Sequence, residues 1–250
     1  MPPRRIRRIS ASLATPRWGS ACREARMWAA AQVPLAISAP TVRPRRPETP
    51  GQAGVGNIYA SGMVGQAKDG RTWRIGTDAE VGWIANGTSI GRSITAAIPP
   101  VFEAYATIVL PFAGQEQDEH DRAVLALLTE QSPGQRWWLG YLDTGADDTV
   151  FPGAPKVTLY AGWHYVLVEA GPEQAATWRQ YGDWSFWKGA LPNLMFPADR
   201  SWLMSTLWDD DWTCLGGPAT LVGRFLRHPD LQARPVALGQ DATPPGHEAL

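Results

Sequence analysis

Cysteine is scarce in this chain of 250 residues, which contains only Cys22 and Cys214. Two cysteines cannot build a disulfide framework or a cysteine-based zinc site. Long apolar runs are also missing, since none reaches the ~18 residues that a membrane-spanning helix needs. We therefore expect a soluble cytoplasmic protein of bacterial type, with no membrane partner, no metal and no other cofactor.

Basic residues are few in most of the chain, although the net charge of −1 conceals this. Residues 1–50 hold 10 of the 23 basic residues and 2 of the 24 acidic ones, which leaves 13 basic and 22 acidic residues in the rest. Because nucleic acid binding depends on positive charge, this acidity argues against a nucleic acid partner. It is compatible with a partner protein, and in particular a basic one.

Composition divides the chain into three regions. Residues 1–62 are rich in Arg and Pro and have no apolar period, which predicts a disordered or non-native N-terminal extension. Residues 63–238 carry periodic apolar patterns and are expected to form a single domain. Residues 239–250 include a Pro-Pro-Gly sequence and are expected to form a loose C-terminal tail.

The most informative stretch, residues 199–228, predicts a strand, an acidic turn, a second strand, a Gly-Pro pair and a helix. Residues 201–208 are rich in Trp, Leu and Met, and three consecutive aspartates interrupt them before the strand resumes at 212–215. Pro218 suits the first position of a helix, and Pro229 ends that helix.

A second stretch, residues 156–181, has the same order of elements. Strands at 157–160 and 163–168 flank a two-residue Ala161-Gly162 turn, and a Gly-Pro pair precedes a helix at 173–181. Two such strand–turn–strand–Gly-Pro–helix units predict an α+β fold, with an antiparallel sheet and helices mainly on one face.

The rest of the domain shows weaker patterns of the same kinds. Apolar periods of two and of three to four residues distinguish strands from helices. They predict strands at 72–75, 80–85, 107–110, 136–142, 149–151 and 234–238, helices at 88–97, 101–106 and 117–131, and a long loop at 181–197.

The sequence DTGADDTV at residues 143–150 resembles the active-site loop of retroviral-type aspartic proteases. In that family two such loops supply paired carboxylates that share a proton and activate a water molecule. The resemblance implies that Asp143 is the catalytic acid and base, that Thr144 and Gly145 shape the loop, and that the enzyme is a homodimer. The alternative is a solvated turn between two strands, for which this composition is equally suitable.

A second motif, G-x-S-x-G at residues 87–91, matches the nucleophile elbow of serine hydrolases, with Ser89 as the nucleophile. The expected strand before it and helix after it provide the context that an elbow needs. The alternative is that Ser89 and its neighbour Thr88 cap the start of a helix.

Aromatic residues are abundant, with 13 Trp in the chain, and several of them lie beside aspartates in two segments. Exposed Trp residues are favoured contacts in protein interfaces. The candidate binding residues are Asp183, Trp184, Trp187, Trp208, Asp209, Asp210, Asp211 and Trp212. We expect a non-catalytic protein-binding domain of adaptor or immunity type, with the Asp143 protease as the alternative and a Ser89 hydrolase as a third candidate.

Overall fold

The strands and helices come from a computed structural model that describes residues 64–66, 70–111, 115–144, 151, 153–179, 191–207 and 210–248. The strands are β1 (Val64–Gln66), β2 (Thr72–Ile75), β3 (Ala104–Val109), β4 (Trp137–Leu142), β5 (Val157–Leu159), β6 (Trp163–Ala170), β7 (Leu194–Pro197), β8 (Leu203–Ser205), β9 (Trp212–Gly217) and β10 (Ala233–Pro235). The helices are α2 (Asp78–Gly87), α3 (Gln115–Gln131), α4 (Pro172–Thr177), α5 (Ala219–Arg227) and the 3-10 helix η1 (Ile94–Ala96).

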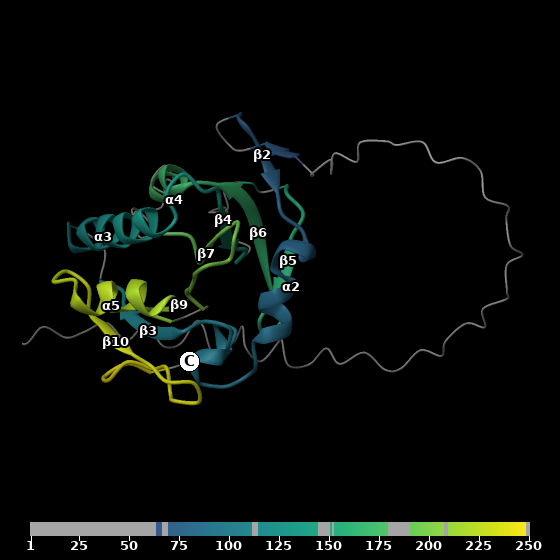
Figure 1. Ribbon diagram of the computed structural model, residues 1–250. Helices are drawn as coiled ribbons and strands as arrows, with labels where there is room; N and C mark the ends of the chain where they lie inside the picture. The colour runs from purple at the N-terminus through teal and green to yellow at the C-terminus, as the bar shows by residue number, and fades with distance from the viewer. Residues whose placement is uncertain are drawn as a thin grey trace, which may run out of the picture. The chain divides into compact units, whose positions relative to one another are not determined.

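The ten strands of this part of the chain form one antiparallel sheet (Figure 1). In spatial order they run β1-β2-β6-β4-β7-β8-β9-β3-β10, and β5 pairs with β6 off this path. Strand β3 lies between two strands from the end of the chain, since Val109 pairs with Trp212 on one side and Ile108 with Ala233 on the other. The predicted α+β class, dominated by an antiparallel sheet, is confirmed.

Both faces of the sheet are buried. In β4, Trp137, Leu139 and Tyr141 belong to one apolar cluster, whereas Trp138 and Leu142 belong to another. This alternation follows from the two-residue period of a strand. Each face of the sheet therefore needs its own covering layer.

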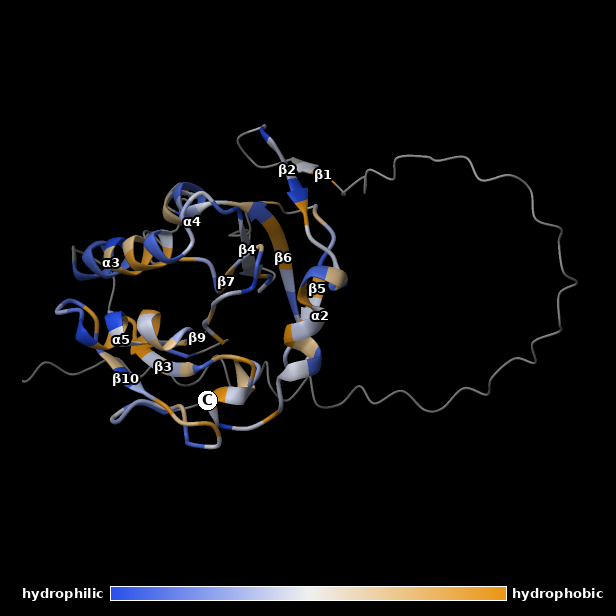
Figure 2. Ribbon diagram, viewed as in Figure 1, coloured by the Kyte–Doolittle hydropathy of each residue, from blue (hydrophilic) through white to orange (hydrophobic). Residues whose placement is uncertain are grey.

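Different helices cover the two faces. Helices α3, α4 and α5 supply buried side chains to the first cluster, and α2 and η1 supply them to the second. Figure 2 shows apolar residues on the sides of α3 and α5 that face each other. The side chains of Leu128 and Phe225, both fully buried, are examples from these two helices.

A buried hydroxyl group ties the end of α3 to the first cluster. Ser132 is 2% exposed, and its Oγ atom donates to the carbonyl of Leu128 at 2.9 Å. The same oxygen accepts the indole N–H groups of Trp137 at 3.0 Å and Trp202 at 3.3 Å. The two rings meet edge to face, with centroids 5.0 Å apart. Every hydrogen-bonding position of this hydroxyl is thus in use.

In each of the two stretches predicted as units, the two strands pair with each other and a helix follows. In the upstream stretch β5 pairs with β6, and Pro172 begins α4 directly after Gly171. In the downstream stretch β8 pairs with β9, and Pro218 directly precedes α5, whose first helical residue is Ala219 and not Pro218 as predicted. The predicted two-residue turn between β5 and β6 is wrong by one residue, because Leu159 pairs with Trp163 across a three-residue loop.

The strand predicted at 80–85 is wrong, because α2 occupies residues 78–87. The helix predicted at 88–97 is also wrong, because α2 ends at Gly87. Thr77 caps this helix: its Oγ1 atom accepts from the N–H of Ala79 at 3.3 Å, and its own N–H donates to Glu80 Oε2 at 2.8 Å. This capping box is a helix-start signal that outweighs the short apolar pattern. Within the region of the second prediction, only the short η1 is helical.

Two further predictions fail in the centre of the sheet. The short helix predicted at 101–106 is wrong, since Ala104 already begins β3. The loop predicted at 181–197 contains β7, whose four residues are all buried between β4 and β8. A strand that is buried on both faces shows no alternation by which it could be recognised. The strand predicted at 149–151 lies outside the described residues except for Phe151.

The segment after Gly239, expected to be loose, contacts the rest of the domain through Asp241, Ala242, Thr243 and His247. Ala242 is buried and donates its N–H to the carbonyl of Arg92 at 2.8 Å. Arg234 donates to the carbonyls of Asp241 and Thr243, each at 2.8 Å.

Among the helices that the structure describes, none has the length and apolar character needed to cross a membrane.

Candidate functional site

Several of the candidate residues lie at one end of the sheet, where β3, β4 and β8 finish and β7 and β9 begin. There the N–H of Asp143 donates to the carbonyl of His164 at 2.8 Å, and the N–H of Leu142 donates to Asn193 Oδ1 at 3.2 Å. On the same end the N–H of Leu110 donates to the carbonyl of Asp211 at 2.8 Å. The sheet therefore brings Asp143 and Asp211 to one end, which we call the acidic end.

Asp143, the candidate protease residue, follows β4 directly. Its carboxylate forms an ion pair with the ammonium group of Lys156, so the carboxylate charge is compensated within its own chain. Thr144 is exposed, and Gly145 lies outside the described residues. Asp143 therefore has a partner within its own chain.

Of the candidate binding residues, Asp210, Asp211 and Trp212 belong to the part of the chain that the structure describes. The side chain of Asp211 is 64% exposed, and its Oδ1 atom lies 2.8 Å from His247 Nδ1. Trp212 is only 3% exposed because it begins β9 within the second cluster, so it cannot form part of a contact surface. Asp183, Trp184, Trp187, Trp208 and Asp209 lie outside the described residues.

Ser89 lies in a loop after α2, and not between a strand and a helix. Its Oγ atom is 3.0 Å from Thr95 Oγ1, and its N–H donates to the carbonyl of Thr95 at 2.9 Å. The strand–turn–helix context that a nucleophile elbow requires is therefore absent from this region, in which every residue from 78 to 97 is described.

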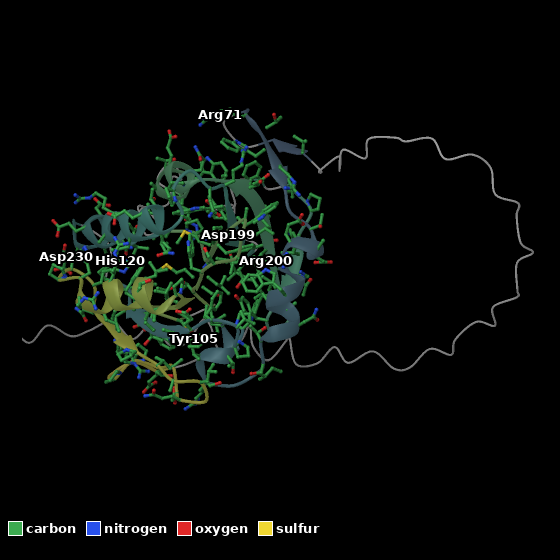
Figure 3. The ribbon with its side chains drawn as sticks, in the orientation of Figure 1. Arg71, Tyr105, His120, Asp199, Arg200 and Asp230 are labelled. Carbon is green, nitrogen blue, oxygen red and sulfur yellow. The ribbon has the colours of Figure 1, made fainter. Side chains whose placement is uncertain are left out.

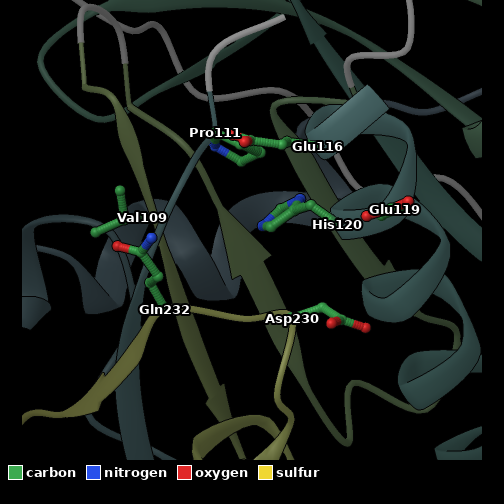
Figure 4. Close-up of a pocket in the computed structure, with 7 residues that line it drawn as sticks. All are labelled: Val109, Pro111, Glu116, Glu119, His120, Asp230 and Gln232. Atoms are coloured by element: carbon green, nitrogen blue, oxygen red, sulfur yellow. The ribbon is translucent and has the colours of Figure 1, made fainter. Parts of the chain in front are cut away.

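A pocket of about 260 Å³ opens beside the acidic end, between the start of α3 and the segment that links α5 to β10 (Figure 4). We call it the His120 pocket, and its lining residues are Val109, Pro111, Glu116, Glu119, His120, Asp230 and Gln232. Figure 3 places the side chains of His120 and Asp230 at the same edge of the molecule. Leu110 connects the pocket to Asp211, since it lies between two lining residues and bonds the carbonyl of Asp211.

His120 is held in the pocket by its neighbour on α3. The side chain is buried, with 2% exposed, and its Nδ1 atom lies 3.1 Å from Asp121 Oδ1. Gln117 Nε2 donates to the same carboxylate oxygen at 2.8 Å. A carboxylate at Nδ1 fixes the ring orientation and makes Nδ1 the protonated nitrogen of the neutral ring.

The other ring nitrogen of His120, Nε2, is not engaged by Asp121. Within the described part of the chain, Nε2 has no hydrogen-bond partner although it is buried. Figure 4 shows the ring projecting from α3 towards Val109 and Gln232. A buried polar atom without a partner is costly, with a penalty of about 1–3 kcal/mol. When the ring is neutral and protonated at Nδ1, its Nε2 atom carries a lone pair that faces the pocket.

The pair formed by His120 and Asp121 lies in an unusual environment. Burial raises the pKa of Asp121 above its ordinary value, while hydrogen bonds from His120 and Gln117 act in the opposite direction. Its second oxygen, Oδ2, has no hydrogen-bond partner among the described residues. The pair is therefore a polar group maintained inside an otherwise apolar layer, an arrangement that often occurs at functional sites.

The rim of the His120 pocket is acidic. Glu116 is exposed, Asp230 has 59% of its side chain exposed, and Glu119 is also exposed. No lysine or arginine is among the seven lining residues. Within the described residues no three His, Cys, Asp or Glu side chains lie close enough together to hold a metal ion. The pocket therefore has the charge to attract a cation without the geometry to chelate a metal.

The sequence interpretation missed this pocket, although half of it could be recognised. Glu116, Glu119 and His120 have the i, i+3, i+4 spacing that places side chains on one face of a helix. Asp230 and Gln232 lie far away in sequence and reach the pocket only because β10 pairs with β3. Neither a protein-family model nor a curated protein nor a solved structure matches this chain.

Proposed function

We propose that this chain is a non-catalytic protein-binding domain, of adaptor or immunity type, whose acidic end takes a basic partner. The observation that carries the proposal is the gathering of exposed carboxylates from three separate segments. Glu116 lies at the start of α3, Asp211 precedes β9, and Asp230 follows α5. These three segments, far apart in sequence, thus each contribute an exposed negative charge near this end of the sheet.

The physical effect of such an arrangement is on association. A group of neighbouring carboxylates raises the local concentration of a basic partner and increases its association rate. Their contribution is screened by salt, because the Debye length falls to about 3 Å at 1 M ionic strength. An acidic binding surface of this kind therefore predicts binding that weakens steeply as salt is added.

The aromatic part of the proposal depends on a smaller set of residues than the sequence suggested. Trp212 is buried, so exposed aromatic contacts would come from Trp184, Trp187 and Trp208, which lie outside the described residues. The acidic part does not depend on them. We propose that the binding surface lies at the acidic end.

Neutralising the three carboxylates tests the proposal. We expect the triple variant Glu116→Gln, Asp211→Asn, Asp230→Asn to bind a lysine- and arginine-rich peptide about tenfold more weakly than the unmodified chain, by roughly 0.5 kcal/mol for each charge. The matched control, Asp78→Asn, Glu130→Gln, Glu173→Gln, removes the same charge elsewhere and should bind almost normally. Equal losses in both variants, or tight binding of a glutamate-rich peptide, would contradict the proposal.

A homodimeric aspartic protease that uses Asp143 is the alternative proposal. Its support is the DTG sequence and the position of Asp143 at the same end of the sheet as Asp211. The Lys156 ion pair favours a structural role for this carboxylate instead. Peptide cleavage at acidic pH that disappears in Asp143→Asn, with both proteins equally folded, would replace the binding proposal with this one.

We also propose that the two strand–turn–strand–Gly-Pro–helix units organise the domain, with helices mainly on one face. The bounds of β5, β6 and α4, and of β8, β9 and α5, support this. In such an arrangement α5 leads directly into the segment that carries Asp230. Circular permutation between the units, followed by a measurement of thermal stability, tests whether each unit has to remain intact.

A further inference from the structure

We propose that the His120 pocket binds one organic cation, a primary ammonium or a guanidinium group at the end of an aliphatic stem. The inference deepens the proposed function and rests on it for the source of the cation, which would be a lysine or arginine side chain of the partner protein. A free amine of the same chemistry is the other source. A partner's side chain and a free amine are expected to give different results in the binding experiment.

The first ground is the unsatisfied nitrogen of His120. Its Nδ1 atom is engaged by Asp121, and its Nε2 atom is buried without a hydrogen-bond partner among the described residues. A neutral imidazole that donates through Nδ1 can only accept through Nε2. The complementary group is an N–H donor, and both ammonium and guanidinium groups carry several.

The second ground is the charge around this nitrogen. The carboxylates of Glu116 and Asp230 lie on opposite sides of the opening in Figure 4, one on α3 and one on the segment before β10. Neither forms an ion pair with a lysine or arginine in the described residues; the imidazole Nδ1 atom of His228 lies 3.9 Å from Asp230 Oδ2. A cationic N–H donor that entered the pocket would therefore supply a positive charge close to these two carboxylates.

The third ground is the size and the apolar part of the lining. A volume of about 260 Å³ is near the lower limit of small-molecule pockets, so it suits one side chain or one small amine. Val109 and Pro111 form an apolar wall, which methylene groups of an aliphatic stem can cover. A metal ion is disfavoured, since no metal-binding group of three side chains occurs within the described residues.

The experiment follows the His120 ring by ¹H–¹⁵N NMR on the full chain, with His120→Gln used to assign its signals among the four histidines. The probes are n-butylammonium, N-acetyl-argininamide and, as a neutral control, N-acetyl-norleucinamide. We expect the two cations to shift the Nε2 signal saturably and the neutral probe to leave it unchanged. A histidine with a merely structural role would not respond to them.

Charge variants make the test specific. Glu116 and Asp230 are exposed, so Glu116→Gln and Asp230→Asn should fold normally and each weaken cation binding about threefold. His120→Gln should weaken it about tenfold, as expected for a hydrogen bond to a charged group. Glu173→Gln on α4 removes the same charge away from the pocket and should have no effect.

The outcomes separate the pocket from the proposed function. Absence of a saturable shift with either cation up to about 50 mM, a range that includes weak millimolar binding, overturns the inference; so does equal weakening by Glu173→Gln. If a basic peptide binds but leaves the Nε2 signal unchanged, the proposed function stands and the pocket inference fails. If the small cations bind and the peptide does not, the pocket stands and the source is a free amine. Peptide binding at least tenfold tighter than that of n-butylammonium, with the same shift, identifies a partner's side chain.

Discussion

Replacing Ser132 by alanine is expected to destabilise the fold by about 2–4 kcal/mol, a large effect for the removal of one oxygen atom. The reason is that this hydroxyl accepts two indole N–H groups in the core, from Trp137 and Trp202. Alanine fills almost the same space but accepts neither. Both donors would then be buried without a partner, since both tryptophans are completely buried.

The magnitude follows from the number of donors that lose their partner. A buried donor without an acceptor costs about 1–3 kcal/mol, so two of them cost about 2–6 kcal/mol. We expect the lower part of this range because the bond from Trp202 is long, at 3.3 Å. The carbonyl of Leu128 adds little, since it still accepts the backbone N–H of residue 132 at 3.1 Å.

Chemical denaturation monitored by tryptophan fluorescence measures the loss directly. The control is Ser89→Ala, which removes an exposed hydroxyl and should change stability by less than about 0.5 kcal/mol. In a chain that already carries Trp137→Phe and Trp202→Phe, the Ser132→Ala substitution should cost less than about 1 kcal/mol, because no donor remains to be left unpaired. A loss below 0.5 kcal/mol in the unmodified background, taken as roughly the limit for surface changes, would refute this reasoning.

Three further substitutions test the fold. A Cβ atom at Gly216 would lie 2.5 Å from core side chains, so Gly216→Ala should cost about 1–3 kcal/mol in urea denaturation, whereas Gly153→Ala, which meets nothing within 4 Å, should be nearly neutral. Thr77→Ala removes the cap of α2 and should cost about 1 kcal/mol, and a loss of helix signal by circular dichroism should accompany it. Because burial raises the pKa of Asp121, its protonated form favours the native state, and this stability is lost as pH rises from the ordinary value of 3.8 through the raised pKa. Asp121→Asn cannot titrate at this position, so its free energy of unfolding should rise relative to that of the unmodified chain over this pH window. If the difference between the two free energies does not change with pH, Asp121 does not have a raised pKa.

The parts of the fold that could be predicted are those with strong local signals. Helix α3 has carboxylates in its first turn and a run of buried apolar residues at helical spacing, and it appears where it was predicted apart from two residues at its start. Helix α2 was missed because only Val81 and Ile84 are buried on it, which is too short an apolar pattern to show a period. Its capping box was the stronger signal, since it depends on two polar residues and not on burial.

Strand β7 shows a different limit. It is buried on both faces between β4 and β8, so neither alternation nor a polar face distinguishes it from an apolar loop. Its position could follow only from the pairing of the whole sheet. Strand β3 could be predicted in part, as the strand at 107–110, but its place in the sheet could not, because its partners come from the last third of the chain.

The candidate site depends on this non-local pairing, which explains why the sequence directed attention elsewhere. Motifs such as DTG and G-x-S-x-G are local, so they can be found without a fold, and they drew the interpretation to Asp143 and Ser89. The His120 pocket has no motif, because half of it comes from one face of α3 and the other half from the segment before β10. Only the pairing of β10 with β3 brings Asp230 opposite Glu116. The feature that gives this pocket its chemistry is a histidine nitrogen that has no hydrogen-bond partner among the residues the structure describes. Whether a buried atom has a partner is a property of the folded chain, so no sequence pattern could reveal it.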